Sequence, residues 1–239
     1  MTAQLCGTML ILALGDLHFQ QRFFNFVTAQ AREGRYDAIC LVGDFLDMFP
    51  NAKRPLDQQV AWVLDWFKKL PTGRTRVFAV SGNHDWSPGE ADDDRDAEAR
   101  WLQRARRKGV AVDGDITRCS ELDFVCQPWV GAVEPAAGSP PVVWLAHAPP
   151  ADTECAKENG WDAGGDWETR WAAESLTSGL MLSGHVHSPD SWADFAGTTL
   201  CLNAGANLEA DVPNHLVIDT TARRAHWVGS RGLKGPMQF

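Results

Sequence analysis

Basic charge, long apolar runs and closely paired cysteines are all scarce in this chain of 239 residues. The formal net charge is −9, which speaks against a broad basic surface of the kind that coats nucleic acid. No apolar run approaches the roughly 20 residues that a transmembrane helix needs. The apolar stretch 8–14 has no basic residue before it, so it predicts a buried strand and not a signal peptide.

The cysteines number six, and none of them forms a C-x-x-C pair. They are scattered along the chain at Cys6, Cys40, Cys119, Cys126, Cys155 and Cys201. Free, buried thiols in a reducing cytoplasm explain this distribution more simply than disulfides do. We therefore expect a cytoplasmic protein without structural disulfides.

Apolar runs and amphipathic stretches alternate through the first half of the chain. Strands are predicted over 8–14, 36–42 and 76–80, and helices over 19–33, 56–70 and 95–109. This alternation is typical of parallel strands covered by helices. The helix over 95–109 would carry the basic cluster from Arg100 to Lys108 on its solvent-facing side.

The second half is richer in strand patterns. They predict strands over 121–127, 141–147, 179–184, 198–203 and 215–220, with one helix over 166–176. The Gly- and Pro-rich segment 148–166 indicates a long loop, and loops of that length are often functional. With 44% hydrophobic residues and no repeat or low-complexity linker, the chain predicts a single domain, 1–239, of the α/β class.

Polar residues of the types that bind metals follow five of the predicted strands, at the point where each strand ends. They are Asp16 and His18, Asp44 and Asp47, Asn83 and His84, His147, and His185 and His187. Five of the seven histidines fall in these clusters. Because ligands bind at the carboxyl ends of strands in open α/β sheets, these side chains predict one shared metal site.

The donor set combines imidazoles, carboxylates and one amide, and it contains no thiolate. Such donors suit Mn²⁺, Fe²⁺, Co²⁺, Ni²⁺ or Zn²⁺. They outnumber the ligands of one tetrahedral ion, so two divalent ions that share a carboxylate would use them fully. We expect Mn²⁺, with Fe, Zn, Ni or Co as alternatives.

The motifs D-x-H, G-D-x-x-D, G-N-H-D, H and G-H-x-H, in this order between Asp16 and His187, resemble the calcineurin-like metallophosphoesterase superfamily. The segment LNAGA, residues 202–206, is similar to the Asn-x-Gly segment that follows the last motif in many members. The resemblance implies a four-layer α-β-β-α sandwich with mixed sheets and a dinuclear centre at the carboxyl ends of the strands. By position, one ion would be held by Asp16, His18, Asp44 and His187, and the other by Asp44, Asn83, His147 and His185.

The resemblance also implies a phosphoesterase in which a hydroxide held between the two ions attacks phosphorus. His84 would be the general acid that protonates the leaving oxygen. Asp47 would be the carboxylate that pairs with His84 and favours its protonated form.

Two departures from the phosphoprotein phosphatases of the superfamily bear on the substrate. Those enzymes carry arginine directly after the second aspartate of G-D-x-x-D and glutamate after G-N-H, whereas this chain has Met48 and Asp85. The segment 147–166 resembles the small bacterial Icc-like phosphoesterases. We therefore expect hydrolysis of small, nucleotide-like phosphodiesters, with Trp86, Arg54 and Trp161 as candidate substrate contacts.

The same motifs leave other functions open. A nuclease or nucleic-acid end-processing enzyme would use the basic cluster from Arg100 to Lys108, and a phosphomonoesterase would need a cation such as Arg54. A non-catalytic scaffold would need no chemistry at all. The net charge speaks against extended nucleic-acid binding, and no sequence feature indicates a membrane or an obligate protein partner. A small phosphoester is the partner that we expect.

Overall fold

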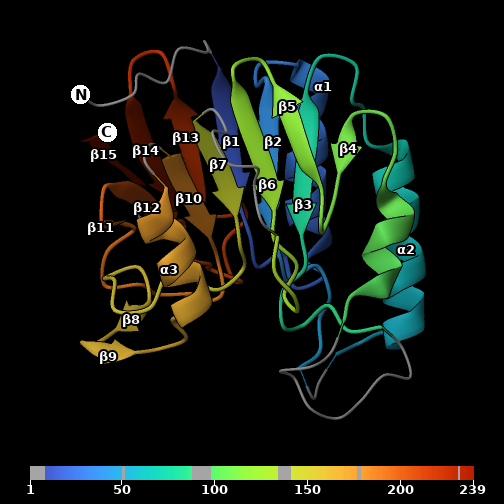
Figure 1. The fold of residues 1–239 in the computed structure, drawn as a ribbon. Helices are drawn as coiled ribbons and strands as arrows, with labels where there is room; N and C mark the ends of the chain where they lie inside the picture. Colours follow the sequence, from blue (N-terminus) through green and yellow to red (C-terminus); the bar gives the residue numbers. More distant parts are fainter. Residues whose placement is uncertain (1–8, 50–51, 88–97, 134–140, 177–178, 231) are drawn as a thin grey trace.

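Two β-sheets lie face to face at the centre of the computed structural model, which describes residues 9–49, 52–87, 98–133, 141–176, 179–230 and 232–239 (Figure 1). The first sheet contains, in spatial order, β15 (Gly232–Gln238), β14 (Arg224–Gly229), β13 (His215–Asp219), β1 (Leu10–Leu14), β2 (Ala38–Val42), β3 (Arg76–Val80) and β4 (Val110–Ala111). Strands β1 to β4 pair in parallel, and β13 joins β1 in the antiparallel direction.

The second sheet contains, in spatial order, β11 (Ala193–Ala196), β12 (Thr199–Asn203), β10 (Gly179–Ser183), β7 (Val142–Leu145), β6 (Leu122–Cys126) and β5 (Ile116–Cys119). Its four central strands are parallel and its two edge strands are antiparallel. Both sheets are therefore mixed. A small separate hairpin pairs β8 (Lys157–Glu158) with β9 (Trp161–Asp162).

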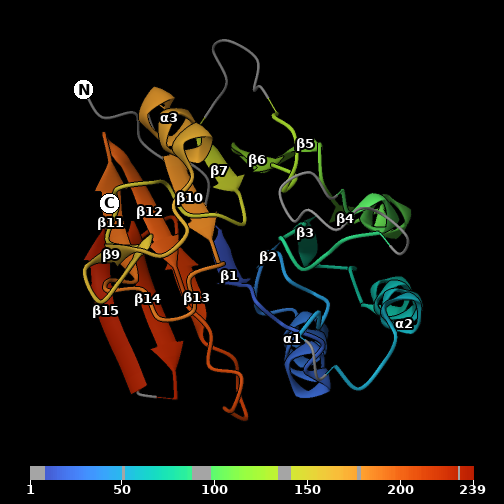
Figure 2. The same cartoon turned by 90° about the horizontal axis from the view of Figure 1, so that it is seen from below.

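Helices cover the outer faces of both sheets, which gives the four layers that the family resemblance implies (Figure 2). Helices α1 (Gln21–Glu33) and α2 (Leu56–Lys69) bury their apolar faces against the first sheet. Helix α3 (Trp167–Ser175) covers the second sheet through Ala173 and its neighbours. The innermost core lies between the sheets, where the rings of Phe78 and Phe124 stack with centroids 4.0 Å apart. The expectation of one domain over 1–239 stays a prediction.

The local reasons for the helices are visible in the sequence. In α1, Phe23, Phe24, Val27 and Ala31 are buried, and their spacing follows the helical period. The same helix ends at Gly34, whose φ of 61° is the left-handed conformation typical of a helix C-terminus. Helix α3 begins at Asp166, whose carboxylate accepts a hydrogen bond from the Thr169 N–H.

The prediction of an α-helix over 95–109 is wrong for its described part. Residues 98–109 contain only a short 3₁₀ helix, η1 (Arg100–Ala105), and the chain then enters β4. The apolar positions of η1 are buried as expected, but Val110 and Ala111 pair with β3 and draw the chain into the sheet. Residues 95–97 lie outside the described ranges.

Other differences concern strands. The predicted strands agree with β1, β2, β3, β6, β7, β10, β12 and β13 to within a few residues at each end. The strands without a counterpart among the predictions are β4, β5, β11, β14, β15 and the β8–β9 hairpin within the expected loop 148–166. None of the helices in the described ranges is long and apolar enough to cross a bilayer. The five described cysteines are free, and Cys6 lies outside the described residues.

A buried carboxylate joins the end of β3 to the segment after β4. Asp113 is 5% exposed, and its Oδ1 accepts a hydrogen bond of 2.8 Å from the Ser81 N–H. Burial raises the pKa of Asp113 to about 6, above its ordinary value of 3.8. The folded state therefore binds the Asp113 proton more tightly than the unfolded state does.

Asp113→Asn is expected to remove a pH dependence of stability. In the wild type, the stabilisation due to this proton is complete below about pH 4 and is lost as the pH rises toward 6. The free energy of unfolding of the variant should therefore rise relative to the wild type by up to about 3 kcal/mol between pH 4 and pH 7. Urea unfolding of both proteins in chelator at the two pH values measures this difference. If the free energies of unfolding of the variant and the wild type differ equally at both pH values, Asp113 is not the group with the raised pKa.

Candidate metal centre

Five loops at the carboxyl ends of the strands carry the predicted metal ligands, and the fold brings these loops together. Asp16 and His18 follow β1, Asp44 follows β2, and Asn83 follows β3, all in the first sheet. His147 follows β7, and His185 and His187 follow β10, in the second sheet. A hydrogen bond of 3.0 Å from the His185 N–H to Asp16 Oδ1 connects the loops of the two sheets. The site therefore lies on the seam between the sheets.

The first ligand group comprises Asp16, His18 and His187, whose donor atoms lie within 4.8 Å of one another. The Nε2 atoms of the two histidines are 3.0 Å apart. His187 Nε2 lies 3.5 Å from Asp16 Oδ1, and His18 Nε2 lies 3.6 Å from Asp44 Oδ2. The structure thus brings together the four residues that the resemblance assigns to one ion.

The second ligand group gathers around the side-chain oxygen of Asn83. This oxygen lies 3.1 Å from His147 Nε2 and 2.9 Å from His185 Nδ1. His147 Nε2 is also 3.3 Å from Asp44 Oδ1. Asp44 therefore presents one carboxylate oxygen to each group, which is the arrangement expected of a bridging ligand.

Two of the ligand residues have a buried polar atom without a hydrogen-bond partner among the described residues. Asp16 Oδ2 and His18 Nδ1 are buried and have no partner among the described residues. A buried carboxylate oxygen without a donor costs free energy unless a cation faces it. The paired Nε2 atoms of His18 and His187 can share only one proton between them. This donor set fits divalent ions.

The backbone at the ligands adopts angles that most residues avoid. The φ angle is 56° at Asp16, 39° at His18, 55° at Asp44 and 68° at His185. Left-handed conformations of non-glycine residues cost free energy and gather at functional sites. The backbone at position 82 passes so close to Asp44 that only glycine fits, because a β-carbon there would lie 2.2 Å from Asp44 Oδ1.

When no ions are bound, burial and neighbouring charges determine which side chains of the site are protonated. Burial by itself would lower the pKa of His147, but the carboxylate of Asp44 raises it to about 9. Burial and the neighbouring His147 lower the pKa of His185 to about 4. Burial opposes ionisation of Asp44, but the charge of His147 holds the pKa of this carboxyl below its ordinary range. Asp44 is therefore ionised at neutral pH and can attract cations.

Two buried side chains behind the ligands fix the loops. The carboxylate of Asp85 accepts hydrogen bonds of 2.8, 3.1 and 2.9 Å from the N–H groups of Phe45, Leu46 and Gly82. The amide of Asn203 donates to the carbonyl oxygens of the residues on either side of His185, at 3.0 and 3.1 Å. Asn203 belongs to the LNAGA segment, so that segment supports the last ligand loop. Such support behind metal ligands orients them.

His84 lies beside the ligands without joining either group. Its backbone N–H donates to Asp44 Oδ1 at 2.9 Å. Its ring is 4.9 Å from the ring of His18 and 5.1 Å from the ring of Phe49, measured between centroids. Its Nδ1 is buried and has no hydrogen-bond partner among the described residues.

The expected pair between His84 and Asp47 is not formed in the described structure. The Asp47 carboxylate instead accepts a hydrogen bond of 3.1 Å from the Phe49 N–H. The backbone N–H and carbonyl of Asp47 are both bonded to the side chain of the buried Gln59, at 2.7 and 2.9 Å. Gln59 belongs to α2, so the backbone of Asp47 is tied to the helix layer.

The three predicted substrate contacts make no hydrogen bond or ring contact with a metal ligand in the described ranges. The guanidinium of Arg54 lies over the ring of Phe19, 5.6 Å from its centroid. Trp86 is half-buried, and its indole Nε1 has no described partner. Trp161 lies on β9 and is 79% exposed. Their role as substrate contacts stays a prediction.

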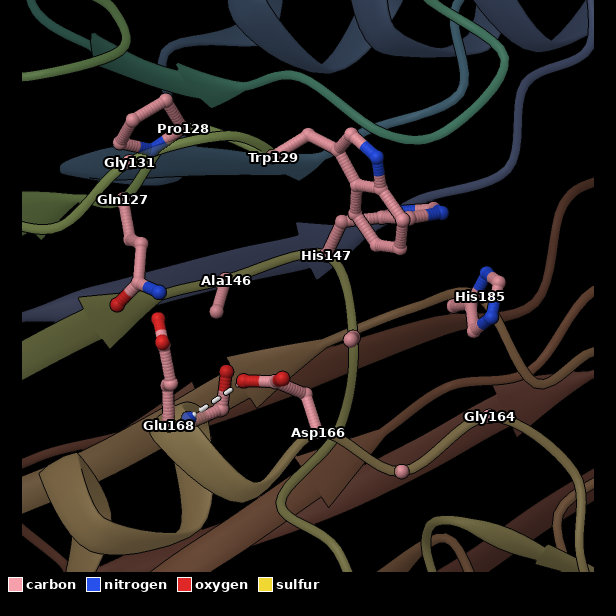
Figure 3. Close-up of a pocket in the computed structure, with 13 residues that line it drawn as sticks. Gln127, Pro128, Trp129, Gly131, Ala146, His147, Gly164, Asp166, Glu168 and His185 are labelled. Carbon is pink, nitrogen blue, oxygen red and sulfur yellow. Dashed lines mark hydrogen bonds between the residues drawn. The ribbon is translucent and has the colours of Figure 1, made fainter. Parts of the chain in front are cut away.

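Sequence patterns did not single out two aromatic residues that lie against the ligands. Phe49 is 37% exposed, and its ring is 5.0 Å from the ring of His18. Trp129 lies against the second ligand group, with its ring 5.6 Å from the rings of both His147 and His185. A cavity of about 340 Å³ opens beside Trp129 (Figure 3). Trp129 follows β6. A search for candidate site residues after every predicted strand, including the one that became β6, would have identified it.

The model of the calcineurin-like phosphoesterase family matches residues 9–189. This range covers most of the chain and contains all five ligand loops. The chain belongs to this family. It is therefore a metallophosphoesterase, a class of hydrolases that act on phosphoesters, and its fold and its ligand loops agree with that membership.

Solved structures share the fold at low sequence identity. TT1561 of Thermus thermophilus is 15% identical, with 92% of this chain and 98% of that chain covered and a TM-score of 0.60. A dimetal phosphatase from Danio rerio is 11% identical, with 97% and 98% covered and a TM-score of 0.57. An archaeal phosphodiesterase is 15% identical, with 92% and 99% covered and a TM-score of 0.52. No curated protein sequence matches the chain significantly.

Asp44→Asn is expected to remove both metal ions, because its two carboxylate oxygens face different ligand groups. His185→Ala and His187→Ala should each remove only one ion, since each histidine belongs to one group. Elemental analysis of protein purified with Mn²⁺ measures this content. Asp47→Asn provides the matched control, which should keep the wild-type content. An Asp44→Asn variant that retains two ions would contradict the bridging role.

Proposed function

We propose that this protein is a dinuclear, metal-dependent phosphodiesterase that hydrolyses small, nucleotide-like diesters. The observation that carries this proposal is the position of Asp44 between two ligand groups, each flanked by an aromatic side chain. Phe49 lies beside the first group, and the cavity next to Trp129 lies beside the second. A diester has two substituents on phosphorus, and the two flanks offer a place for each.

Bound divalent ions, which we propose to be Mn²⁺, would supply Lewis-acid stabilisation of the phosphoryl charge and a water nucleophile at neutral pH. His84 would deliver a proton to the leaving oxygen. Its backbone is fixed by the bond to Asp44, and its ring lies against the rings of both His18 and Phe49. The leaving substituent would therefore lie on the Phe49 side, where the exposed ring can stack on a base.

The side chains near the site favour a diester over a monoester. A dianionic monoester needs an extra cation beside the metal ions, and the position after Asp47 is Met48. Arg54 is engaged over Phe19, and none of the described residues that line the cavity is Lys or Arg. The archaeal phosphodiesterase and the dimetal phosphatase share this fold, so fold likeness by itself does not choose between the two reactions.

The basic cluster from Arg100 to Lys108 gives little support to the nuclease alternative. Arg106 pairs with Asp115 at 2.9 Å, and the Arg107 guanidinium donates to the Phe67 carbonyl at 3.0 Å. These side chains hold η1 and the following turn against the rest of the first half. They do not line the cavity beside the ligands. The intact ligand set speaks against the scaffold alternative.

We also propose a cytoplasmic location. The support comes from the cysteines, because all five described cysteines are free and four of them are buried. Burial raises the pKa of Cys201 to about 12 and also raises that of Cys155. Thiols of this kind are inert and suit a reducing compartment.

The protein should hydrolyse bis-p-nitrophenyl phosphate with a higher kcat/KM than p-nitrophenyl phosphate. The reason is that none of the described residues lining the cavity beside the second ligand group is basic and could meet the second negative charge of the monoester. Steady-state kinetics with Mn²⁺ measures both values, and chelator should abolish both activities. A tenfold preference for the monoester would overturn the diester assignment.

His84→Ala should lose activity according to how much the leaving group needs a proton. General acid catalysis contributes roughly 10²–10⁴-fold for an alkoxide, whereas nitrophenolate leaves without much help. The variant should therefore lose far more kcat on a 2′,3′-cyclic nucleotide than on bis-p-nitrophenyl phosphate, with metal content unchanged. His226→Ala, on β14 outside the ligand loops, is the matched control. Equal losses on both substrates would assign His84 to charge stabilisation instead.

A further inference from the structure

The cavity beside the second ligand group is large enough for a substituent of the substrate. Its volume of about 340 Å³ falls within the range in which proteins bind small molecules. Its walls come from the segment after β6, the segment after β7 and the segment that begins α3 (Figure 3). His147 and His185 belong to the same lining, so a group bound in the cavity would touch the metal centre.

Both carboxylates that line the cavity come from the start of α3. Asp166 Oδ2 accepts the Thr169 N–H at 2.6 Å, which fixes its position. The side chain of Glu168 has no hydrogen bond or ion pair with any described residue, and it extends toward the part of the cavity that carries Gln127 (Figure 3). The described lining contains no Lys or Arg that could neutralise these carboxylates. The α3 wall therefore carries negative charge.

The N-terminus of α3 does not convert this wall into a site for an anion. A helix N-terminus attracts anions through its free N–H groups, but the Asp166 carboxylate already accepts one of them and lies at the positive end of the helix dipole. A second phosphate or carboxylate on the substrate would face Asp166 and Glu168 and be repelled.

The segment after β6 contributes one aromatic ring, that of Trp129, and one side-chain amide, that of Gln127, to the lining. Trp129 is half-buried beside the two histidine ligands. Gln127 Oε1 accepts a hydrogen bond of 2.9 Å from Trp144 Nε1, which holds the Gln127 side chain in place. Trp129, Asp166 and Glu168 line the same cavity. An aromatic ring together with carboxylates is a combination that recognises alkylammonium groups, because the ring face and the carboxylates both attract positive charge.

We propose that the cavity binds an ester substituent with an alkylammonium group, such as the choline part of a choline phosphodiester. The phosphate would lie at the metal centre, and the cationic substituent would lie between Trp129 and the carboxylates of Asp166 and Glu168. This substituent stays on phosphorus while the other substituent leaves on the Phe49 side. The inference rests on the proposed phosphodiesterase function.

Two chromogenic diesters of matched shape test the inference. The first is p-nitrophenyl phosphorylcholine, and the second is p-nitrophenyl 3,3-dimethylbutyl phosphate, in which carbon replaces the charged nitrogen. For the wild type with Mn²⁺, the choline ester should have a kcat/KM about tenfold higher than the neutral ester. In Glu168→Gln this ratio should fall about threefold or more, since one of the two attracting charges is removed.

Glu174→Gln is the matched control, because Glu174 lies on the same helix and pairs with Arg170 instead of lining the cavity. It should keep the wild-type ratio. Trp129→Leu should lower the ratio with its metal content unchanged, which separates the loss of the aromatic face from damage to the ligands. A wild-type ratio near one, or a ratio that Glu168→Gln leaves unchanged, would overturn the inference.

Failure of the inference can be distinguished from failure of the proposed function. Hydrolysis of the neutral ester at the same rate as the choline ester would retain the phosphodiesterase and reject the cation site. If neither ester is hydrolysed, the proposed function fails, and calorimetric titration decides the inference separately. In that titration, phosphocholine should bind the manganese-loaded protein more tightly than 3,3-dimethylbutyl phosphate, and equal affinities would reject the cation site.

Discussion

The rest of the site depends on the buried, ionised carboxylate of Asp44. Its two oxygens lie 3.3 Å from His147 Nε2 and 3.6 Å from His18 Nε2, and Oδ1 also accepts the His84 N–H at 2.9 Å. One carboxylate therefore positions two ligand groups and the candidate acid. An ionised carboxylate that is 2% exposed is stable only with positive charge or donors around it. This requirement explains why imidazoles from both sheets surround it and why glycine is needed at position 82.

The ligands and most of the strands that carry them could be predicted from the sequence. Runs such as Ala38–Val42 are buried along their whole length, so hydrophobicity alone locates them, and the ligand types begin where each run ends. The parallel arrangement then places those ends at one edge, which is a consequence of topology and needs no side-chain detail. Asp16, Asp44, Asn83 and His147 were accessible to prediction for this reason.

The remaining features depend on tertiary packing that no local pattern contains. Asp47 has the right spacing for a partner of His84, but the buried Gln59 of α2 binds its backbone and its carboxylate turns to Phe49. The chain before β4 has the apolar spacing of an α-helix, yet pairing with β3 shortens it to η1. Trp129 lies at the site because β6 ends at the same edge as β7, and strand order cannot be read from an isolated segment.

The hydrogen bond from the His185 N–H to Asp16 Oδ1 crosses the seam between the sheets, and the two ligand groups cross it as well. Each group takes donors from an early strand and from a late one, so a bound ion would act as a crosslink between distant parts of the chain. Ions that bind only the folded state stabilise it in proportion to the logarithm of their free concentration. The folding equilibrium of this enzyme would then respond to the metal supply, so that protein abundance and metal availability become linked quantities.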